Sequence, residues 1–182
     1  TSIVDPIEFF KTLLKMPDKS NQLLNVVNQS LISYAHSLVR SGADVIVLSD
    51  PTATREILGI KYFEQFALPL YEAFSKAMDV PWIIHICGNV NAILPLLNRT
   101  GASALSVDSL MSIHRLKEII DLPLMGNVST LLLQEGPIER VENITMNALN
   151  AGVSIVAPAC GLGMSTPIKH LAAMTQTVKK QK

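Results

Sequence analysis

The stretch WIIHICG, residues 82–88, decides the fold of this chain. It is a short apolar run that ends in the pattern His-x-Cys, followed by a glycine. Because side chains alternate across a strand, His85 and Cys87 project from the same face. A second apolar run, APACGLG at residues 157–163, contains Cys160, which a glycine follows. If both strands belong to one parallel sheet, an imidazole and two thiols converge at the same strand ends.

Three ligands of this kind suit Zn²⁺, and a site with three protein ligands leaves a fourth position open for chemistry. Two other interpretations of the cysteines remain, an inert buried thiol pair and a disulfide. Cys87 and Cys160 are the only cysteines. No signal-peptide pattern marks export, which favours reduced thiols over a disulfide. We therefore expect a cytoplasmic protein.

The composition narrows the class of protein. A chain of 182 residues is long enough for one domain with a substantial core, and we expect a single domain over residues 1–182. Hydrophobic residues make up 48% and charged residues 16%, but no apolar run approaches the ~18 residues of a membrane span. Lys and Arg total 15, as do Asp and Glu. Without a basic stripe, the chain lacks the electrostatic footprint of nucleic-acid binding.

Five short apolar runs predict strands, and helical patterns of apolar residues flank them. The predicted strands cover residues 43–48, 80–86, 104–107, 123–128 and 153–158. A first helix is predicted near residues 6–14. A second, longer helix is predicted to begin at a cap, either Asp18 or Ser20, and to stop at Gly42. Further helices are predicted over residues 62–78, 89–98, 113–120, 138–148 and 167–179. Alternation of strand and helix indicates a parallel α/β sheet with right-handed crossovers.

Such a sheet is either a doubly wound open sheet or a (β/α)₈ barrel, and polar residues at the ends of the strands favour the barrel. These residues are Asp50, His85, Cys87, Asp108, Asn127 and Cys160. Five strands do not close an eight-stranded barrel, which needs at least ~200 residues. The chain also begins at Thr1 and not at a methionine. We therefore expect the C-terminal portion of a larger (β/α)₈ TIM barrel, an incomplete barrel with about five parallel strands.

The other polar residues have structural and functional interpretations. Asp50 is either a cap for the following turn or a wall residue that orients a substrate or ligand. Asp108 has the same two interpretations, and its place at a strand end favours the site. Asn127 either satisfies backbone groups in a turn or contributes to function. The remaining histidines, at positions 36, 114 and 170, are expected to be surface or packing residues.

Zinc held by one neutral imidazole and two thiolates has a formal charge of zero. Such a centre is a weak Lewis acid for water, but it binds an incoming thiol and keeps it deprotonated at neutral pH. Hydrolytic zinc sites more often use histidine and carboxylate ligands with a bound water. The ligand set therefore indicates thiol alkylation and not hydrolysis.

Five motifs then occur in a fixed order: GADVIVLSDPTA (42–53), HICGN (85–89), SVD (106–108), GNV (126–128) and APACGLGMSTP (157–167). Together they resemble the uroporphyrinogen decarboxylase superfamily, and more narrowly its methylcobamide:coenzyme M methyltransferases. Uroporphyrinogen decarboxylases share the barrel but work without a metal. The His-x-Cys pattern with a distal cysteine is what separates the zinc methyltransferases from them.

The resemblance implies that His85, Cys87 and Cys160 are zinc ligands. It also implies that a zinc-bound thiolate, from a small thiol such as coenzyme M, attacks the methyl group of a methylcobamide carried by a partner corrinoid protein. Asp50 and Asp108 are then the candidate catalytic residues. The candidate cofactor-binding residues are Gly88, Asn127 and Gly161, the two glycines because they let the loops turn sharply and let cofactor and substrate approach.

The chain departs from the family in two respects. The family commonly continues the GNV motif with Asp-Pro, whereas Ser129 and Thr130 follow it here. The family's chains are also longer at the N-terminus by about three barrel strands, and part of the thiol pocket belongs to that section.

Three hypotheses about function follow. The first is a zinc-dependent thiol methyltransferase. The second is a metal-free relative, either a decarboxylase or a methyltransferase that acts on a pterin. The third is an incomplete barrel that binds a metal or docks a partner without turnover. Because an open barrel exposes a strand edge and an apolar inner surface, the third predicts self-association or a need for the missing N-terminal half.

Overall fold

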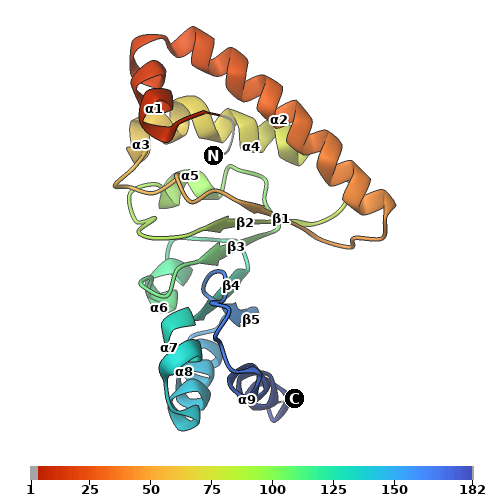
Figure 1. Cartoon of the computed structure of the whole chain (residues 1–182), viewed down its shortest axis with the longest axis vertical. Helices are drawn as coiled ribbons and strands as arrows, with labels where there is room; N and C mark the ends of the chain where they lie inside the picture. The colour runs from red at the N-terminus through yellow and green to blue at the C-terminus, as the bar shows by residue number, and fades with distance from the viewer. Residues whose placement is uncertain (1–3, 182) are drawn as a thin grey trace.

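The structure, a computed structural model, describes residues 4–181, and these residues form a five-stranded sheet. The strands are β1 (Ile46–Ser49), β2 (Trp82–Ile86), β3 (Ala104–Val107), β4 (Leu124–Val128) and β5 (Ile155–Pro158). They lie side by side in chain order, and every neighbouring pair is parallel. The predicted α/β fold, with five parallel strands alternating with helices, is confirmed (Figure 1).

The central strands are buried on both faces, as expected of a parallel sheet covered by helices. In β2 every residue is buried except His85, which is half-buried, and all four residues of β3 are buried. The edge strands differ. In β1 the side chain of Val47 is 53% exposed, and in β5 that of Ile155 is 43% exposed. Both residues lie on strands that have a partner on one side only.

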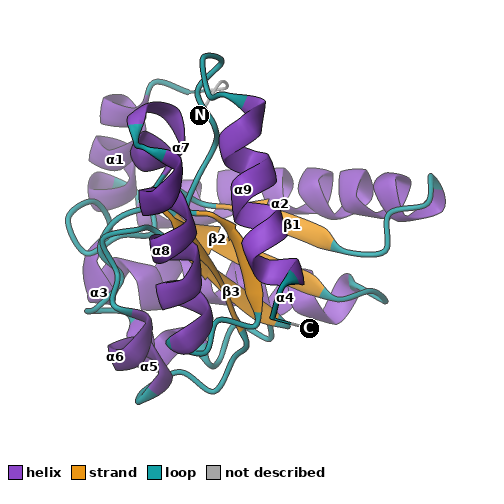
Figure 2. Cartoon of the chain, turned by 90° about the horizontal axis from the view of Figure 1, so that it is seen from below, coloured by secondary structure: helices purple, strands orange, loops and turns teal. Residues whose placement is uncertain are grey.

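The helices follow the strands in the same order, from α1–α4 beside β1 to α7–α9 beside β5 (Figure 1). The long helix α2 extends past the sheet (Figure 2). The elements are α1 (Pro6–Lys15), α2 (Pro17–Arg40), α3 (Gly59–Tyr62), the π-helical turn η1 (Phe63–Ala67), α4 (Leu68–Ala77), α5 (Leu94–Leu97), α6 (Ile113–Lys117), α7 (Thr130–Glu135), α8 (Ile138–Asn150) and α9 (Ile168–Lys179).

The predicted N-terminal cap of the long helix, Asp18 or Ser20, is wrong, whereas the predicted stop at Gly42 is confirmed, since the helix ends at Arg40 and Gly42 has a positive φ. Helix α2 begins at Pro17, with Met16 at the cap position. Proline is favoured in the first helical turn because its fixed φ suits the helix and its missing N–H would have no partner there. Asp18 therefore lies inside the first turn, where its negative charge interacts favourably with the positive end of the helix dipole. Ser20 lies further into the helix and is buried.

Two other helices differ from their predictions because of prolines. The helix predicted over residues 62–78 is interrupted by η1 and restarts as α4, which carries Pro69 in its first turn. Since proline has no N–H to donate, it disrupts the regular hydrogen-bond ladder at this point. The helix predicted over residues 89–98 shrinks to α5, which has Pro95 in its first turn.

Helix α7 was not predicted. It is only six residues long, and it begins where the Ser129 hydroxyl accepts a hydrogen bond from the Leu132 N–H. This is a serine N-cap, which supplies a partner for one of the free N–H groups of the first turn. The predicted helix at 113–120 also ends earlier, at Lys117.

The main hydrophobic core lies between the sheet and the helices that cover it. Its largest side chains include an aromatic group, in which Phe74 meets Trp82 edge to face with ring centroids 5.2 Å apart. A smaller cluster joins Val128 of β4 to Leu133, Val141 and Met174 of the last helices. The two cores hold the strands in place and thereby fix the positions of the strand ends.

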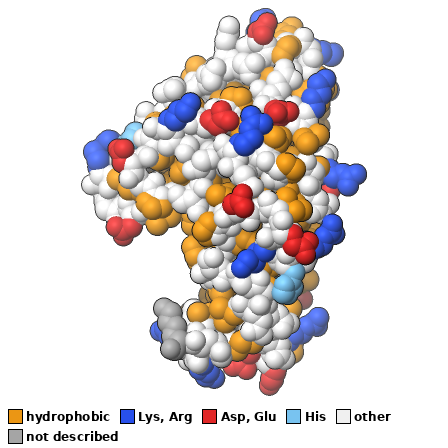
Figure 3. All heavy atoms as spheres, turned by 180° about the vertical axis from the view of Figure 1, so that it is seen from behind, with side chains coloured by type: hydrophobic (Ala, Val, Ile, Leu, Met, Phe, Trp, Pro, Cys, Tyr) orange, Lys and Arg blue, Asp and Glu red, His pale blue; other side chains and the backbone are white. Residues whose placement is uncertain are grey.

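The surface mixes charges of both signs. On the face shown in Figure 3, basic and acidic side chains are interspersed, with hydrophobic side chains between them. Among residues 4–181, no helix is both long enough and apolar enough to span a lipid bilayer.

Candidate metal centre

One imidazole and two thiols meet at the C-terminal ends of β2 and β5. The Nε2 atom of His85 lies 2.9 Å from the Sγ atom of Cys87. That sulfur lies 2.9 Å from the Sγ atom of Cys160. The three ligand atoms all lie within 4.8 Å of one another. Residues 73 positions apart in the chain are thus neighbours in space.

Local backbone geometry explains how these side chains reach one point. His85 is the fourth residue of β2. Cys87 comes two positions after His85 and is the first residue beyond the strand. Alternation along the strand direction gives both residues the same face. Gly88 then turns the chain with φ +87°, a left-handed conformation that residues with a Cβ rarely adopt. Cys160 follows β5 by two residues and is exposed, whereas His85 and Cys87 are half-buried.

The three atoms fit a zinc ion. In a tetrahedral site with Zn–S near 2.3 Å and Zn–N near 2.0 Å, ligand atoms lie ~3.5–3.8 Å apart. The two separations of 2.9 Å are shorter than this by less than ~1 Å, so small side-chain rotations suffice. Two sulfurs and one imidazole also match the ligand preference of zinc. The exposed side of Cys160 leaves room for a fourth ligand.

The environment sets the protonation of the ligands. Burial lowers the pKa of His85, and the Asp108 carboxylate opposes this to a lesser extent. The imidazole is therefore neutral near pH 7 and has a free lone pair. Burial raises the pKa of Cys87 to about 12, with further contributions from Cys160 and Asp108. A bound cation reverses this effect, because a metal deprotonates a coordinating thiol.

Asp108 lies beside the cluster and holds its loop. The Oδ2 atom of Asp108 accepts a hydrogen bond of 3.0 Å from the N–H of Gly88, the residue after Cys87. Its Oδ1 atom accepts another of 2.9 Å from the Leu110 N–H. Both carboxylate oxygens are thus used by backbone groups. Asp108 fixes the Cys87–Gly88 segment and adds a negative charge near the two thiols.

Ser106 is a site residue for which the sequence analysis gave no role. Its Oγ atom lies 2.9 Å from Nδ1 of His85, and its side chain is almost fully buried. The register explains the contact, because Ser106 pairs with His85 across β2 and β3. Its spacing of two from Asp108 could have placed both on the site face, but the pairing register is not readable from a single sequence.

Asp50 does not join the cluster through its side chain. Its backbone N–H donates to the carbonyl of His85, at 2.9 Å. Its carboxylate accepts from the N–H and the hydroxyl of Thr52 and from the hydroxyl of Tyr71 in α4. Burial, and then the nearby Asp50 charge, raise the pKa of Tyr71 well above its usual value. Asp50 also lines a cavity of about 670 Å³ against α1, α2 and α4.

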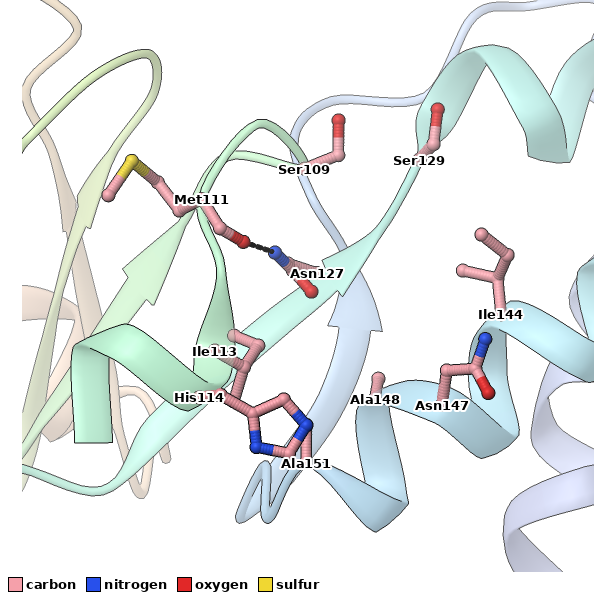
Figure 4. Close-up of a pocket in the computed structure, with 10 residues that line it drawn as sticks. All are labelled: Ser109, Met111, Ile113, His114, Asn127, Ser129, Ile144, Asn147, Ala148 and Ala151. Atoms are coloured by element: carbon pink, nitrogen blue, oxygen red, sulfur yellow. Dashed lines mark hydrogen bonds between the residues drawn. The ribbon is translucent and has the colours of Figure 1, made fainter. Parts of the chain in front are cut away.

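Asn127 also points elsewhere. Its amide nitrogen donates to the carbonyl of Asp108 at 3.1 Å and to that of Met111 at 2.9 Å. Its side chain lines a second cavity of about 270 Å³, together with His114 of α6 and Asn147 of α8 (Figure 4). Asn127 therefore ties β4 to the loop after β3, which carries Asp108, and the structure gives it no contact with the ligand atoms.

The two glycines predicted to turn the loops, Gly88 and Gly161, differ in backbone conformation. Gly161 does not adopt a positive φ, and a Cβ placed on it meets no described atom within 4 Å. Of these two glycines, only Gly88 makes the left-handed turn.

The histidines outside the ligand cluster have packing or surface positions. His170 is buried, with Nδ1 2.8 Å from the Leu133 carbonyl, and it links α9 to α7. His36 is half-buried, and His114 is exposed.

Proteins of known function resemble this chain in sequence. The methylcobamide:CoM methyltransferase MtaA of Methanosarcina barkeri is 32% identical over 178 residues, which cover 96% of this chain and 52% of that protein. The methylcobamide:CoM methyltransferase MtbA of Methanosarcina mazei is 34% identical over 176 residues, covering 94% and 52%. The chain thus spans about half the length of these relatives.

A solved structure gives the same picture. A methyltransferase from Methanosarcina mazei superimposes with a TM-score of 0.94 at 32% sequence identity, over 98% of this chain and 54% of that protein. The described sheet thus covers part of a uroporphyrinogen decarboxylase-like barrel, as the sequence predicted. The uroporphyrinogen decarboxylase (URO-D) family matches residues 1–181. This chain therefore belongs to the uroporphyrinogen decarboxylase family.

Proposed function

We propose that this chain carries the thiol-activating site of a zinc-dependent methyltransferase, which moves a methyl group from a methylated corrinoid protein to a small thiol such as coenzyme M. The convergence of one imidazole and two thiols on one point supports the proposal. Relatives at 32% and 34% identity are methylcobamide:CoM methyltransferases, which fits the same chemistry.

His85, Cys87 and Cys160 are the residues that would hold the zinc. When bound, the zinc supplies a site at which the substrate thiol is deprotonated at neutral pH and kept nucleophilic. When the neutral His85 carries its ring proton on Nδ1, the Nε2 lone pair is available to the metal. The exposed side of Cys160 is the direction from which substrate can enter.

The methyl transfer needs no external oxidant or reductant. The sulfur supplies the electron pair of the new carbon–sulfur bond, and the cobalt of the corrinoid keeps the pair of the broken cobalt–carbon bond. The protein must therefore align donor and acceptor and exclude competing nucleophiles. Gly88 keeps the β2 loop free of a side chain beside Cys87.

Exposed apolar side chains near the strand ends fit a large partner. Leu110 follows β3, Leu131 follows β4 and Met164 follows β5, and all three are well exposed. Because the strands are parallel, the segments that follow them, including helix α7 with Leu131, begin at the same end of the sheet as the ligand cluster. Exposed apolar residues grouped at one end are typical of a surface that docks another molecule. A corrinoid protein presenting its cofactor is the partner that the proposal requires.

Metal analysis is the first test. We expect the chain, purified under reducing conditions, to bind one zinc per chain, with X-ray absorption showing two sulfur ligands and one histidine nitrogen. Cys160→Ser and His85→Ala are expected to lose the metal. His114→Ala is the matched control, because it removes an exposed histidine from outside the cluster. A wild-type chain that binds no zinc after reconstitution contradicts the proposal.

Activity is tested separately. The zinc-loaded chain is incubated with methylcobalamin and coenzyme M, and the methyl thioether is measured by mass spectrometry. We expect product with wild type and His114→Ala, and none with Cys160→Ser. The assay is repeated after adding the N-terminal half of a full-length relative. If the chain binds zinc but gives no product in either assay, the site binds metal without turnover. That outcome rejects the catalytic part of the proposal.

A further inference from the structure

The structure assigns to Ser106 a positioning role: its hydroxyl holds the His85 imidazole so that Nε2 points at the two sulfurs. The inference rests on the proposed function, since it concerns how this chain orients a metal ligand. It starts from the contact of 2.9 Å between Ser106 Oγ and His85 Nδ1.

The two ring nitrogens of His85 have different neighbours. Nε2 faces Cys87 Sγ, whereas Nδ1 faces Ser106 Oγ. A metal bound through Nε2 requires the lone pair of that atom, so the ring proton must sit on Nδ1. The Nδ1–H group then needs an acceptor, and the serine oxygen is the acceptor at hydrogen-bond distance. Ligand histidines are commonly oriented by such a second hydrogen bond, which also makes them better donors.

Ser106 is itself held in place. It is almost fully buried, and it lies in β3 directly opposite His85 of β2 in the strand register. Two residues later, Asp108 accepts the Gly88 N–H that follows Cys87. β3 and the residue that follows it thus support two of the ligands: Ser106 contacts the imidazole, and Asp108 holds the segment that carries the Cys87 thiol.

A hydroxyl suits this position because it both donates and accepts. With metal bound, the serine oxygen accepts from Nδ1–H. Without metal, the ring can carry its proton on Nε2 beside the Cys87 sulfur, and the serine hydroxyl then donates to Nδ1. Neither state leaves the Nδ1 atom without a protein partner, and losing that partner costs free energy in a half-buried side chain. Alanine at position 106 leaves that atom unpaired in both states.

The test compares zinc affinity in three chains. Ser106→Ala is expected to weaken zinc binding by ~10–100-fold in a competition titration with a chromophoric chelator. Ser112→Ala is the matched control, because Ser112 is an exposed serine of the next loop whose side chain makes no capping bond in the described structure. Its affinity should equal that of wild type. The Co²⁺-substituted form of Ser106→Ala should show shifted d–d bands.

A second measurement does not depend on a variant that must fold. In the zinc-loaded wild-type chain, ¹⁵N NMR should show a protonated Nδ1 on His85 with slow solvent exchange, and that exchange should be faster in Ser106→Ala. Unchanged zinc affinity in Ser106→Ala, or a rapidly exchanging Nδ1 proton in wild type, overturns the inference. If wild type binds no zinc at all, the proposed function fails first, and the two failures are thereby distinguished.

Discussion

Replacing Gly88 by alanine tests whether the turn after the ligand pair holds the site together. Gly88 has φ +87°, and a Cβ placed there lies 3.1 Å from the Thr54 Cγ2 atom. The left-handed backbone costs an alanine ~1–2 kcal/mol, and the tight methyl contact adds ~1 kcal/mol. Alanine also lowers the entropy of the unfolded chain, which offsets ~0.4–1 kcal/mol. We expect a net loss of about 1–2.5 kcal/mol in the free energy of unfolding.

Two glycine variants separate the backbone cost from the contact. Gly59 has φ +68°, and a Cβ placed on it meets no described atom within 4 Å. Gly59→Ala should therefore lose stability only through the left-handed backbone. Gly161→Ala has neither a positive φ nor a contact, although it sits beside Cys160. Combining Gly88→Ala with Thr54→Ser removes the methyl that makes the contact, and should recover ~1 kcal/mol as a coupling energy.

Urea unfolding and a zinc titration measure the two consequences. The midpoint should fall for Gly88→Ala at constant m-value, because the surface exposed on unfolding does not change. Zinc affinity should also fall for Gly88→Ala, since relief of the strain displaces the adjoining Cys87, and it should be unaffected in Gly59→Ala. The reasoning is refuted if Gly88→Ala and Gly161→Ala differ by less than about 0.5 kcal/mol, or if Gly88→Ala binds zinc like wild type.

Three further outcomes are expected. Because burial raises the pKa of Cys87 to about 12 without metal, its thiol is protonated at pH 7.5, and zinc binding should release its proton. A weakly buffered titration should show proton release when zinc is added to wild type and none for Cys87→Ala, which is expected to lose the metal. In the metal-free chain, diamide should form the Cys87–Cys160 disulfide, since the sulfurs lie 2.9 Å apart, and bound zinc should block it, as non-reducing mass spectrometry can show. Leu105→Ala, at a fully buried position in β3, should cost ~2–5 kcal/mol in urea unfolding, and a loss below ~1 kcal/mol contradicts the packing described above.

The strands were predictable because their signal is local. Runs such as residues 104–107 are apolar, short and bounded by turn residues, and the structure has a strand over the same range. The helices were less predictable where prolines interrupt them. Apolar periodicity continues through residues 62–78, but periodicity carries no information about the N–H group that Pro69 lacks. The structure contains a π-helical turn just before this proline. Helix α7 was missed because six residues are too few to establish a period.

The site was predictable only in part, for a related reason. Alternation along β2 is enough to place His85 and Cys87 on one face, and the strand order places Cys160 at the same end of the sheet. The direction of a side chain just past a strand end is not set by alternation. Asp50 turns to Thr52 and Tyr71, because these offer hydrogen-bond donors. Asn127 likewise turns to carbonyls of the neighbouring loop.

The ligand cluster also bears on the shape of the sheet. Strands β2 and β5 are separated by β3 and β4, and neighbouring strands lie ~4.8 Å apart, so their ends would be ~14 Å apart in a flat sheet. The sulfurs of Cys87 and Cys160 nevertheless lie 2.9 Å apart. The two residues after β5 and the two cysteine side chains reach across that gap only if they all extend straight along the sheet, whereas side chains on a strand stand roughly perpendicular to the sheet. Curvature of the sheet toward its inner face brings the strand ends together without that extension. Closing curvature of this kind is what a barrel requires, so the short distance between the sulfurs fits a barrel better than a flat open sheet.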